Sequence, residues 1–180
     1  MIDLDGRIFL WLHQHLAEGG GLALMCVLTV VGSGWGALLV LPLFASPRTR
    51  RFGGSLSAVL AVTAIVVFVL KAIVKRKRPY LVVPDVHPRV FEAPTDFSFP
   101  SGHAAGSFAF ATFVAVVLLS AEGSRAARIA IGVALLSVAL GVGISRCALG
   151  VHFPGDVAAG ALLGGTAGAI GARLHRRRVT

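Results

Sequence analysis

The stretch Ser145–Asp156 reads SRCALGVHFPGD, and it lies between two long apolar segments of the chain. Within it, Arg146 is a permanent cation, and His152 can act as a nucleophile or carry a proton. Asp156 follows His152 by four residues, so one turn of helix would place both side chains on the same face. Pro154 suits the first turn of a helix, where its missing N–H group costs nothing. The stretch therefore predicts a loop that enters a helix, with the positive end of that helix close to the imidazole.

The segments on either side belong to a strongly apolar chain. Hydrophobic residues make up 56% of the 180 residues and charged residues 14%, and the mean hydropathy is +0.82. This composition predicts an all-α integral membrane protein, with residues 1–180 forming a single domain. The formal net charge of +9 does not indicate nucleic-acid binding, because the basic residues occur in short clusters between apolar spans. The two cysteines, Cys26 and Cys147, do not form a disulfide framework.

Five apolar segments are long enough to cross a bilayer. Residues 1–20 precede them and carry Trp11 on an apolar face, which predicts a short helix lying in the membrane interface. In the last segment Gly160, Gly164 and Gly168 recur every four residues and predict close helix packing in lipid. We therefore expect a helical bundle of about five to six transmembrane helices, made of five spans and the interfacial helix. The predicted spans are residues 22–45, 53–74, 102–120, 127–145 and 154–172.

The charges of the loops predict how the chain is oriented in the membrane. With five spans, the 46–52 loop, the 121–128 turn and the C-terminal tail lie on one side and carry nine of the 17 Lys and Arg residues. The other side carries eight, of which three (Lys71, Arg78 and Arg146) are candidate site residues. The remaining bias makes the first side cytoplasmic by the positive-inside rule. The polar clusters would then face outward.

A second polar cluster, Lys71–Pro79 (KAIVKRKRP), ends the second predicted span. Lys71 and Arg78 are seven residues apart, so two helical turns would place them on one face, and Pro79 would then end the helix. Lys71 closes an apolar run, at a depth where a cation usually needs a partner or a task. For the three cations at 75–77 we favour contact with anionic lipid at the interface.

The third cluster is Pro100–His103 (PSGH), at the start of the third predicted span. Ser101 can cap the helix that follows, and Gly102 lets a ligand come close to the backbone. Free N–H groups and a positive helix end make this position an anion site. Capping does not explain His103, which we interpret as a residue that takes part in the chemistry.

Together the three clusters suit an anion with several oxygens, above all phosphate. They suit a metal ion poorly, because three cations would oppose a dication, and we expect neither metal nor cofactor. The residue types predict that His152, oriented by Asp156, attacks phosphorus to form a phosphohistidine. His103 would protonate the leaving oxygen and then activate water. The predicted phosphate-binding residues are Lys71, Arg78, Ser101, Gly102 and Arg146.

The three clusters resemble the signature of the type 2 phosphatidic acid phosphatases. These form the membrane branch of a superfamily that also holds vanadium haloperoxidases and bacterial acid phosphatases. The signature is Lys, six residues, Arg-Pro; then Pro-Ser-Gly-His; then Ser-Arg, five residues, His, three residues, Asp. All three parts match without a gap over residues 71–156. The resemblance implies the residue roles given above and a helical core like that of the haloperoxidases. Many members are described with six spanning helices, whereas we predict five and an interfacial one.

The resemblance also implies a metal-independent hydrolase of lipid phosphates in the bacterial cytoplasmic membrane, with its active site facing the periplasm. Small bacterial members act on undecaprenyl diphosphate, phosphatidylglycerophosphate, phosphatidic acid or the lipid A 1-phosphate, and the sequence does not choose among these. We expect a broad or isoprenoid-directed lipid phosphatase, with residues 80–99 forming the rim of the headgroup site. The alternatives are a lipid phosphotransferase with the same site, a haloperoxidase, and a non-catalytic membrane scaffold. The intact set of ionisable groups speaks against the scaffold.

Overall fold

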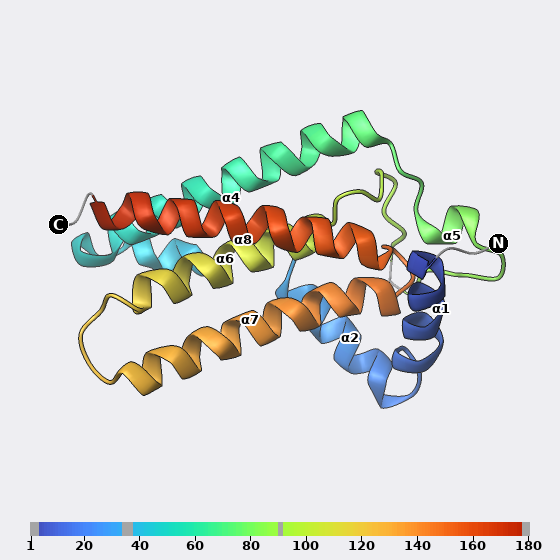
Figure 1. Ribbon diagram of the computed structural model, residues 1–180, viewed down its shortest axis with the longest axis horizontal. Helices are drawn as coiled ribbons and strands as arrows, with labels where there is room; N and C mark the ends of the chain where they lie inside the picture. Colours follow the sequence, from blue (N-terminus) through green and yellow to red (C-terminus); the bar gives the residue numbers. More distant parts are fainter. Residues whose placement is uncertain (1–3, 34–37, 90–91, 178–180) are drawn as a thin grey trace.

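The computed structural model describes residues 4–33, 38–89 and 92–177. Throughout these ranges the chain forms helices and irregular segments and no β-strand, which confirms the predicted all-α class (Figure 1). In chain order the elements are α1 (Leu4–Leu16), α2 (Gly20–Val31), the 3₁₀ helix η1 (Leu38–Phe44), α4 (Pro47–Val74), α5 (Pro79–Val82), α6 (Gly102–Leu118), α7 (Arg125–Ala148) and α8 (Pro154–Arg177).

Serine side chains mark the starts of three of these helices. Ser46, Ser101 and Ser124 precede α4, α6 and α7, and each hydroxyl oxygen accepts a hydrogen bond from a backbone N–H in the first turn. Such caps satisfy donors that the helix itself leaves unpaired. The cap predicted for Ser101 is therefore confirmed, and it fixes where the third polar cluster enters its helix.

The end of α4 differs from the expected path. The helix stops at Val74, because Lys75 adopts a left-handed conformation with φ of 53° and its N–H donates to the Lys71 carbonyl. Residues 75–78 are not helical. The prediction that two continuous helical turns link Lys71 to Arg78 is therefore wrong. Lys71 lies in the last turn of α4, and Arg78 lies at the end of the loop that follows.

Helix α6 forms the centre of the bundle and packs most extensively on α8, with α4 and α7 on its other sides (Figure 1). The contact depends on Gly160, Gly164 and Gly168, which we call the glycine row. A Cβ atom at these positions would lie 2.5, 2.0 and 2.5 Å, respectively, from a backbone carbonyl oxygen of α6 or of Ser101, which caps it. Since no side chain fits in that space, the row lets the two helices approach backbone to backbone. The predicted packing role of these glycines is confirmed.

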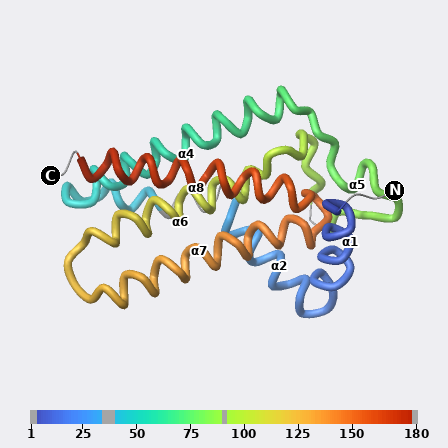
Figure 2. Tube along the Cα trace, viewed as in Figure 1, coloured from blue at the N-terminus to red at the C-terminus, as the bar shows by residue number. Residues whose placement is uncertain are grey.

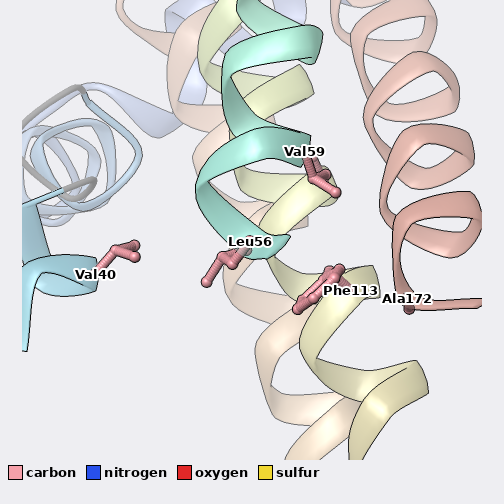
Figure 3. Close-up of a cluster of buried hydrophobic side chains, with 6 residues drawn as sticks. Val40, Leu56, Val59, Phe113 and Ala172 are labelled. Carbon is pink, nitrogen blue, oxygen red and sulfur yellow. The ribbon is translucent and has the colours of Figure 1, made fainter. Parts of the chain in front are cut away.

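A cluster of buried apolar side chains lies at the end of the bundle far from α1. It joins η1, α4, α6 and α8, and Phe113 at its centre is fully buried (Figure 3). Its buried members are Val40, Leu56, Val59, Ala109, Phe113 and Ala172. The polar clusters lie at the opposite end of the bundle.

The predicted first span, residues 22–45, is not one continuous helix. Helix α2 ends at Val31, and the hydroxyl of Ser33 donates to a carbonyl of its last turn at 2.6 Å. Pro42 lies inside η1, where a regular α-helix would lack its N–H donor. Residues 34–37 fall outside the described part of the chain.

By length and composition, three described helical segments could cross a membrane: Pro47–Val82, Arg125–Ala148 and Pro154–Arg177. Helices α1 and α2 meet at an angle of 115° and would add a fourth span if the bent pair counts as one. Helix α6 is apolar but has only 17 residues, which is about 25 Å of helix and close to the minimum for a span. The number of five spans and the interfacial position of α1 stay predictions.

Replacing Gly164 by alanine should loosen the contact between α6 and α8. The new Cβ would lie 2.0 Å from the carbonyl oxygen of Ala105, an overlap that costs about 1–3 kcal/mol. We expect the apparent melting temperature in detergent to fall by about 3–10 °C. Gly165→Ala is the matched control, because its Cβ would be 3.8 Å from Thr112 Oγ1. Equal melting temperatures for the two variants would contradict the role given to the glycine row.

Candidate active site

The three polar clusters meet at the end of the bundle that α1 crosses (Figure 2). The turn between α7 and α8, the N-terminus of α6 and the loop after α4 come together there. Backbone hydrogen bonds join them: the N–H of Ser101 donates to the Asp156 carbonyl at 3.0 Å, and that of Ser98 donates to the Arg76 carbonyl at 2.8 Å. Residues far apart in the sequence are thus held in one place by main-chain bonds.

His152 lies between a cation and a carboxylate, and its side chain is only 2% exposed. Its Nε2 atom is 3.2 Å from Nη1 of Arg78. Because a guanidinium group has donors and no acceptor, Nε2 must be the unprotonated nitrogen that accepts. The proton then sits on Nδ1, which lies 3.3 Å from Oγ of Ser98 and 3.5 Å from Oδ2 of Asp156. The lone pair needed for nucleophilic attack is on the cationic side of the ring.

Burial lowers the pKa of His152 to about 4. The contact with Asp156 acts in the opposite direction, and the charges of Arg78 and Arg146 add to the effect of burial. The imidazole is therefore neutral at neutral pH, which is the state a nucleophile requires.

Asp156 is fully buried, and its two oxygens have different partners. Oδ2 accepts hydrogen bonds from the Ser98 hydroxyl at 2.5 Å and from the Phe153 backbone N–H at 2.9 Å. Oδ1 accepts from Nη1 of Arg76 at 2.7 Å. The expectation that Arg76 contacts lipid headgroups is therefore wrong, because the left-handed turn at Lys75 directs the chain back toward the start of α8.

Lys71 and Arg78 both bind the carboxylate of Asp96, which belongs to the segment 80–99 that we expected to form the rim of the site. Asp96 accepts from Lys71 Nζ at 2.7 Å through Oδ2 and from Arg78 Nη2 at 2.5 Å through Oδ1. Burial alone would raise the pKa of Asp96, but the hydrogen bonds from the two cations outweigh it and lower the pKa. An anion that binds these cations therefore has to compete with Asp96 or share them with it.

Arg146 provides the third cation. It is 5% exposed at the end of α7, and its Nη1 donates to the hydroxyl of Thr29. Within the described residues, its Nε has no hydrogen-bond partner. A buried donor without a partner is costly, so an anionic ligand would find this N–H group available.

These groups stand at one end of a cavity of about 590 Å³. Six of the eight predicted site residues line it: Lys71, Arg78, Gly102, His103, Arg146 and His152. Asp156 lies behind His152, and Ser101 caps the helix that carries His103. Beyond the polar end, the walls come from the end of α2 and from α4, α6 and α7, and they are mostly apolar, formed in part by Leu60, Ala64, Val67, Phe68, Phe110, Leu135, Val138 and Val142. Within the described part of the chain, no three His, Cys, Asp or Glu side chains are grouped as a metal site would require.

Local sequence patterns do not indicate the contacts behind the site. Oδ1 of Asp5 in α1 accepts from the N–H of Gly155 at 2.7 Å, although 150 residues separate them. Oδ2 of Asp5 accepts from Nη2 of Arg76 at 2.6 Å. Ser98, which donates to Asp156, was also missed. Its position two residues before the PSGH motif is the one sequence signal that could have pointed to it.

Residues 52–180 match the family model of the PAP2 superfamily. The chain belongs to this superfamily. Over 140 residues, the PAP2 chain is 34% identical to the decaprenylphosphoryl-5-phosphoribose phosphatase of Mycobacterium tuberculosis, a match that covers 76% of this chain and 69% of that protein. Over 121 residues it is 34% identical to the bacitracin transport permease protein BcrC of Bacillus licheniformis, covering 64% and 54% of the two chains.

Two solved structures are similar to this PAP2 chain over most of its length. Aquifex aeolicus LpxE superposes with a TM-score of 0.74 at 28% identity, covering 93% of each chain. The PAP2-type phosphatidylglycerolphosphate phosphatase of Bacillus subtilis superposes with a TM-score of 0.79 at 24% identity, covering 98% of this chain and 86% of the other, and supports the fold. The protein is an enzyme, a phosphatase of the PAP2 type, and a multi-pass membrane protein.

Asp96→Asn should strengthen inhibition by orthovanadate, an anion shaped like phosphate. The variant keeps the size of the side chain but removes the charge that pairs with Lys71 and Arg78. Since the carboxylate is 56% exposed, we expect the inhibition constant to fall by up to about fivefold, about 1 kcal/mol. The inhibition constant is measured with p-nitrophenyl phosphate as the substrate.

Asp85→Asn is the control for this variant, because Asp85 is exposed and its φ of 59° suits asparagine. Weaker inhibition of Asp96→Asn would mean that the carboxylate holds the two cations in place for the anion rather than competing with it.

Proposed function

We propose that this PAP2 phosphatase hydrolyses a membrane lipid phosphate or diphosphate at the outer face of the cytoplasmic membrane, through a phosphohistidine. The cavity is the observation that carries the proposal. Its polar end combines three cations and two histidines, and the rest of it runs between mostly apolar walls, formed mainly by α4, α6 and α7. A phosphorylated headgroup fits the first part and a hydrocarbon tail fits the second.

In the first step, Nε2 of His152 attacks phosphorus, an N–P bond forms and the P–O bond to the lipid breaks. Arg78 already donates to Nε2, so its N–H groups are close to the point of attack. The imidazole becomes positively charged as the bond forms, and the nearby carboxylate of Asp156 stabilises that charge. His103 gives a proton to the leaving oxygen.

In the second step, water cleaves the N–P bond. His103 takes a proton from the water as it attacks, which restores its first protonation state, and inorganic phosphate leaves. Lys71, Arg78 and Arg146, together with the backbone at Ser101 and Gly102, stabilise the charge on the phosphate oxygens in both steps. No cofactor takes part in this scheme.

The relatives support a lipid substrate. The mycobacterial relative is named for a decaprenyl-linked phosphoribose, and the Bacillus subtilis neighbour for phosphatidylglycerolphosphate. The candidates are undecaprenyl diphosphate, phosphatidylglycerophosphate, phosphatidic acid and the lipid A 1-phosphate, with decaprenylphosphoryl phosphoribose as a further one. We favour a broad or isoprenoid-directed enzyme. The outward orientation rests on the loop charges described above.

Purified protein in detergent with EDTA should release phosphate from at least one of these five lipids, and His152→Ala should release none. Rapid quenching of the wild-type reaction should trap a phosphoryl group that is labile in acid and stable in base, as a phosphohistidine is. Phosphate that passes to a second lipid without release would indicate a phosphotransferase. A folded wild-type protein that is inactive on all five lipids would refute the hydrolase.

Gly106→Leu should impair hydrolysis of long-chain lipids and spare small soluble esters. Gly106 lines the cavity, and a Cβ atom there would meet no atom within 4 Å, so the larger side chain enters the apolar space without disturbing the fold. We expect kcat/KM for a long-chain substrate to fall by about 10-fold or more. Activity on p-nitrophenyl phosphate should stay close to that of the wild type.

Gly54→Leu on α4 is the matched control, because its Cβ would also be in open space and it does not line the cavity. If Gly106→Leu lowered both activities equally, the apolar part of the cavity would not be the binding site of the tail.

A further inference from the structure

The charge of Asp156 has to be balanced, because the carboxylate is fully buried. A buried carboxylate is stable only when a cation or several hydrogen bonds compensate it. His152 is the obvious partner, yet the bond from Arg78 to Nε2 requires a neutral ring. Arg76 is the cation in direct contact, with Nη1 at 2.7 Å from Oδ1.

Arg76 is itself held from two sides. Its Nη2 donates to Asp5 of α1 at 2.6 Å, and its guanidinium carbon lies 4.3 Å above the ring centre of Phe153. Asp5 in turn accepts from the Gly155 N–H at 2.7 Å, which caps the first turn of α8 from another helix. The same segment that carries His152 and Asp156 is thereby tied to α1.

We propose that Arg76, held by Asp5, is a positioning residue that balances the buried charge of Asp156 so that His152 stays neutral and nucleophilic. This inference rests on the proposed function of His152. Arg76 contacts the oxygen of Asp156 that faces away from His152, and it therefore acts on the nucleophile through the carboxylate. Without it, Asp156 would keep only the hydrogen bonds from the Ser98 hydroxyl and the Phe153 N–H, and a positive charge on His152 would become more favourable.

The other charges around His152 do not replace Arg76. They lie on the side of the ring that faces the cavity, and all but one are groups that disfavour an additional positive charge. In order of chain position these groups are Lys71 of α4, Arg78 of the loop after α4, Asp96 of the loop before α6, His103 of α6 and Arg146 of α7. Asp96 is already paired with two of the cations.

The pKa of His152 should rise in one variant of this contact and not in the other. In Arg76→Gln, the full charge of Asp156 acts on the imidazole, and the pKa should rise from about 4 by about one unit. In Asp5→Asn, one negative charge is removed and Arg76 pairs with Asp156 alone, so the pKa should stay the same or fall. A loosened structure would affect both variants alike and would not produce this difference.

Two measurements follow the pKa in detergent. The first is the ¹⁵N-histidine NMR titration of the resonance that His152→Ala removes, and it does not depend on any reaction. The second is the acid limb of the pH profile of kcat/KM, which reports groups of the free enzyme. The limb should move to higher pH in Arg76→Gln, because a protonated His152 cannot attack.

Arg76→Lys should keep the acid limb near that of the wild type, since the charge is retained. Lys77→Gln is the control, because it removes a cation from the same loop at an exposed position. If Arg76→Gln left the NMR pKa of His152 unchanged, the inference would be overturned. If the wild type released no phosphate but the titration shifted as expected, the proposed function would fail and the electrostatic inference would stand.

Discussion

The buried carboxylate of Asp156 is the interaction on which the active end of the molecule depends. One oxygen binds Ser98 and the backbone of Phe153, and the other binds Arg76. Its backbone carbonyl accepts from Ser101. A single residue in the first turn of α8 therefore holds the loop after α4, the loop before α6 and the turn that carries His152. A fully buried charge tolerates few arrangements, which is why so many partners converge on it.

The contact between α6 and α8 gives this site a rigid base. Because the glycine row lets the two backbones touch, the N-terminus of α6 cannot slide relative to that of α8 without backbone overlap. His103 and His152 start from these two helix ends, so the distance between them is set by main-chain packing. The apolar cluster around Phe113 packs η1, α4, α6 and α8 together at the other end of the bundle (Figure 3).

The sequence predicted the parts of the molecule that depend on local pattern. The all-helical class, the cap at Ser101 and the packing of the glycine row follow from residues close together in the chain, and the family match confirms the resemblance. The sequence-based prediction was wrong where the backbone conformation of a single residue determines the path of the chain. Lys75 adopts a left-handed φ that nothing in the local pattern indicates, and this one residue ends α4 and changes the role of Arg76. The continuous first span failed for another reason: Pro42 interrupts a regular α-helix, and the apolar run around it hid that signal.

Long-range pairs of charges were out of reach for a different reason. Asp5 and Asp96 are ordinary acidic residues in polar segments, and only the folded chain reveals that each binds a buried or half-buried cation.

Asp156 and the glycine row share one spacing: each glycine follows the preceding member by four residues, beginning four after Asp156, and all four positions are buried. The residue that serves the chemistry is thus the first member of the row that serves the packing. Adding or deleting one residue between Asp156 and Gly160 would turn the two faces about 100° apart. Such a change would leave every side chain of the signature in the sequence and still separate the site from its support. An insertion in the loop between α6 and α7 would not have this effect, because no shared helical face runs through that loop.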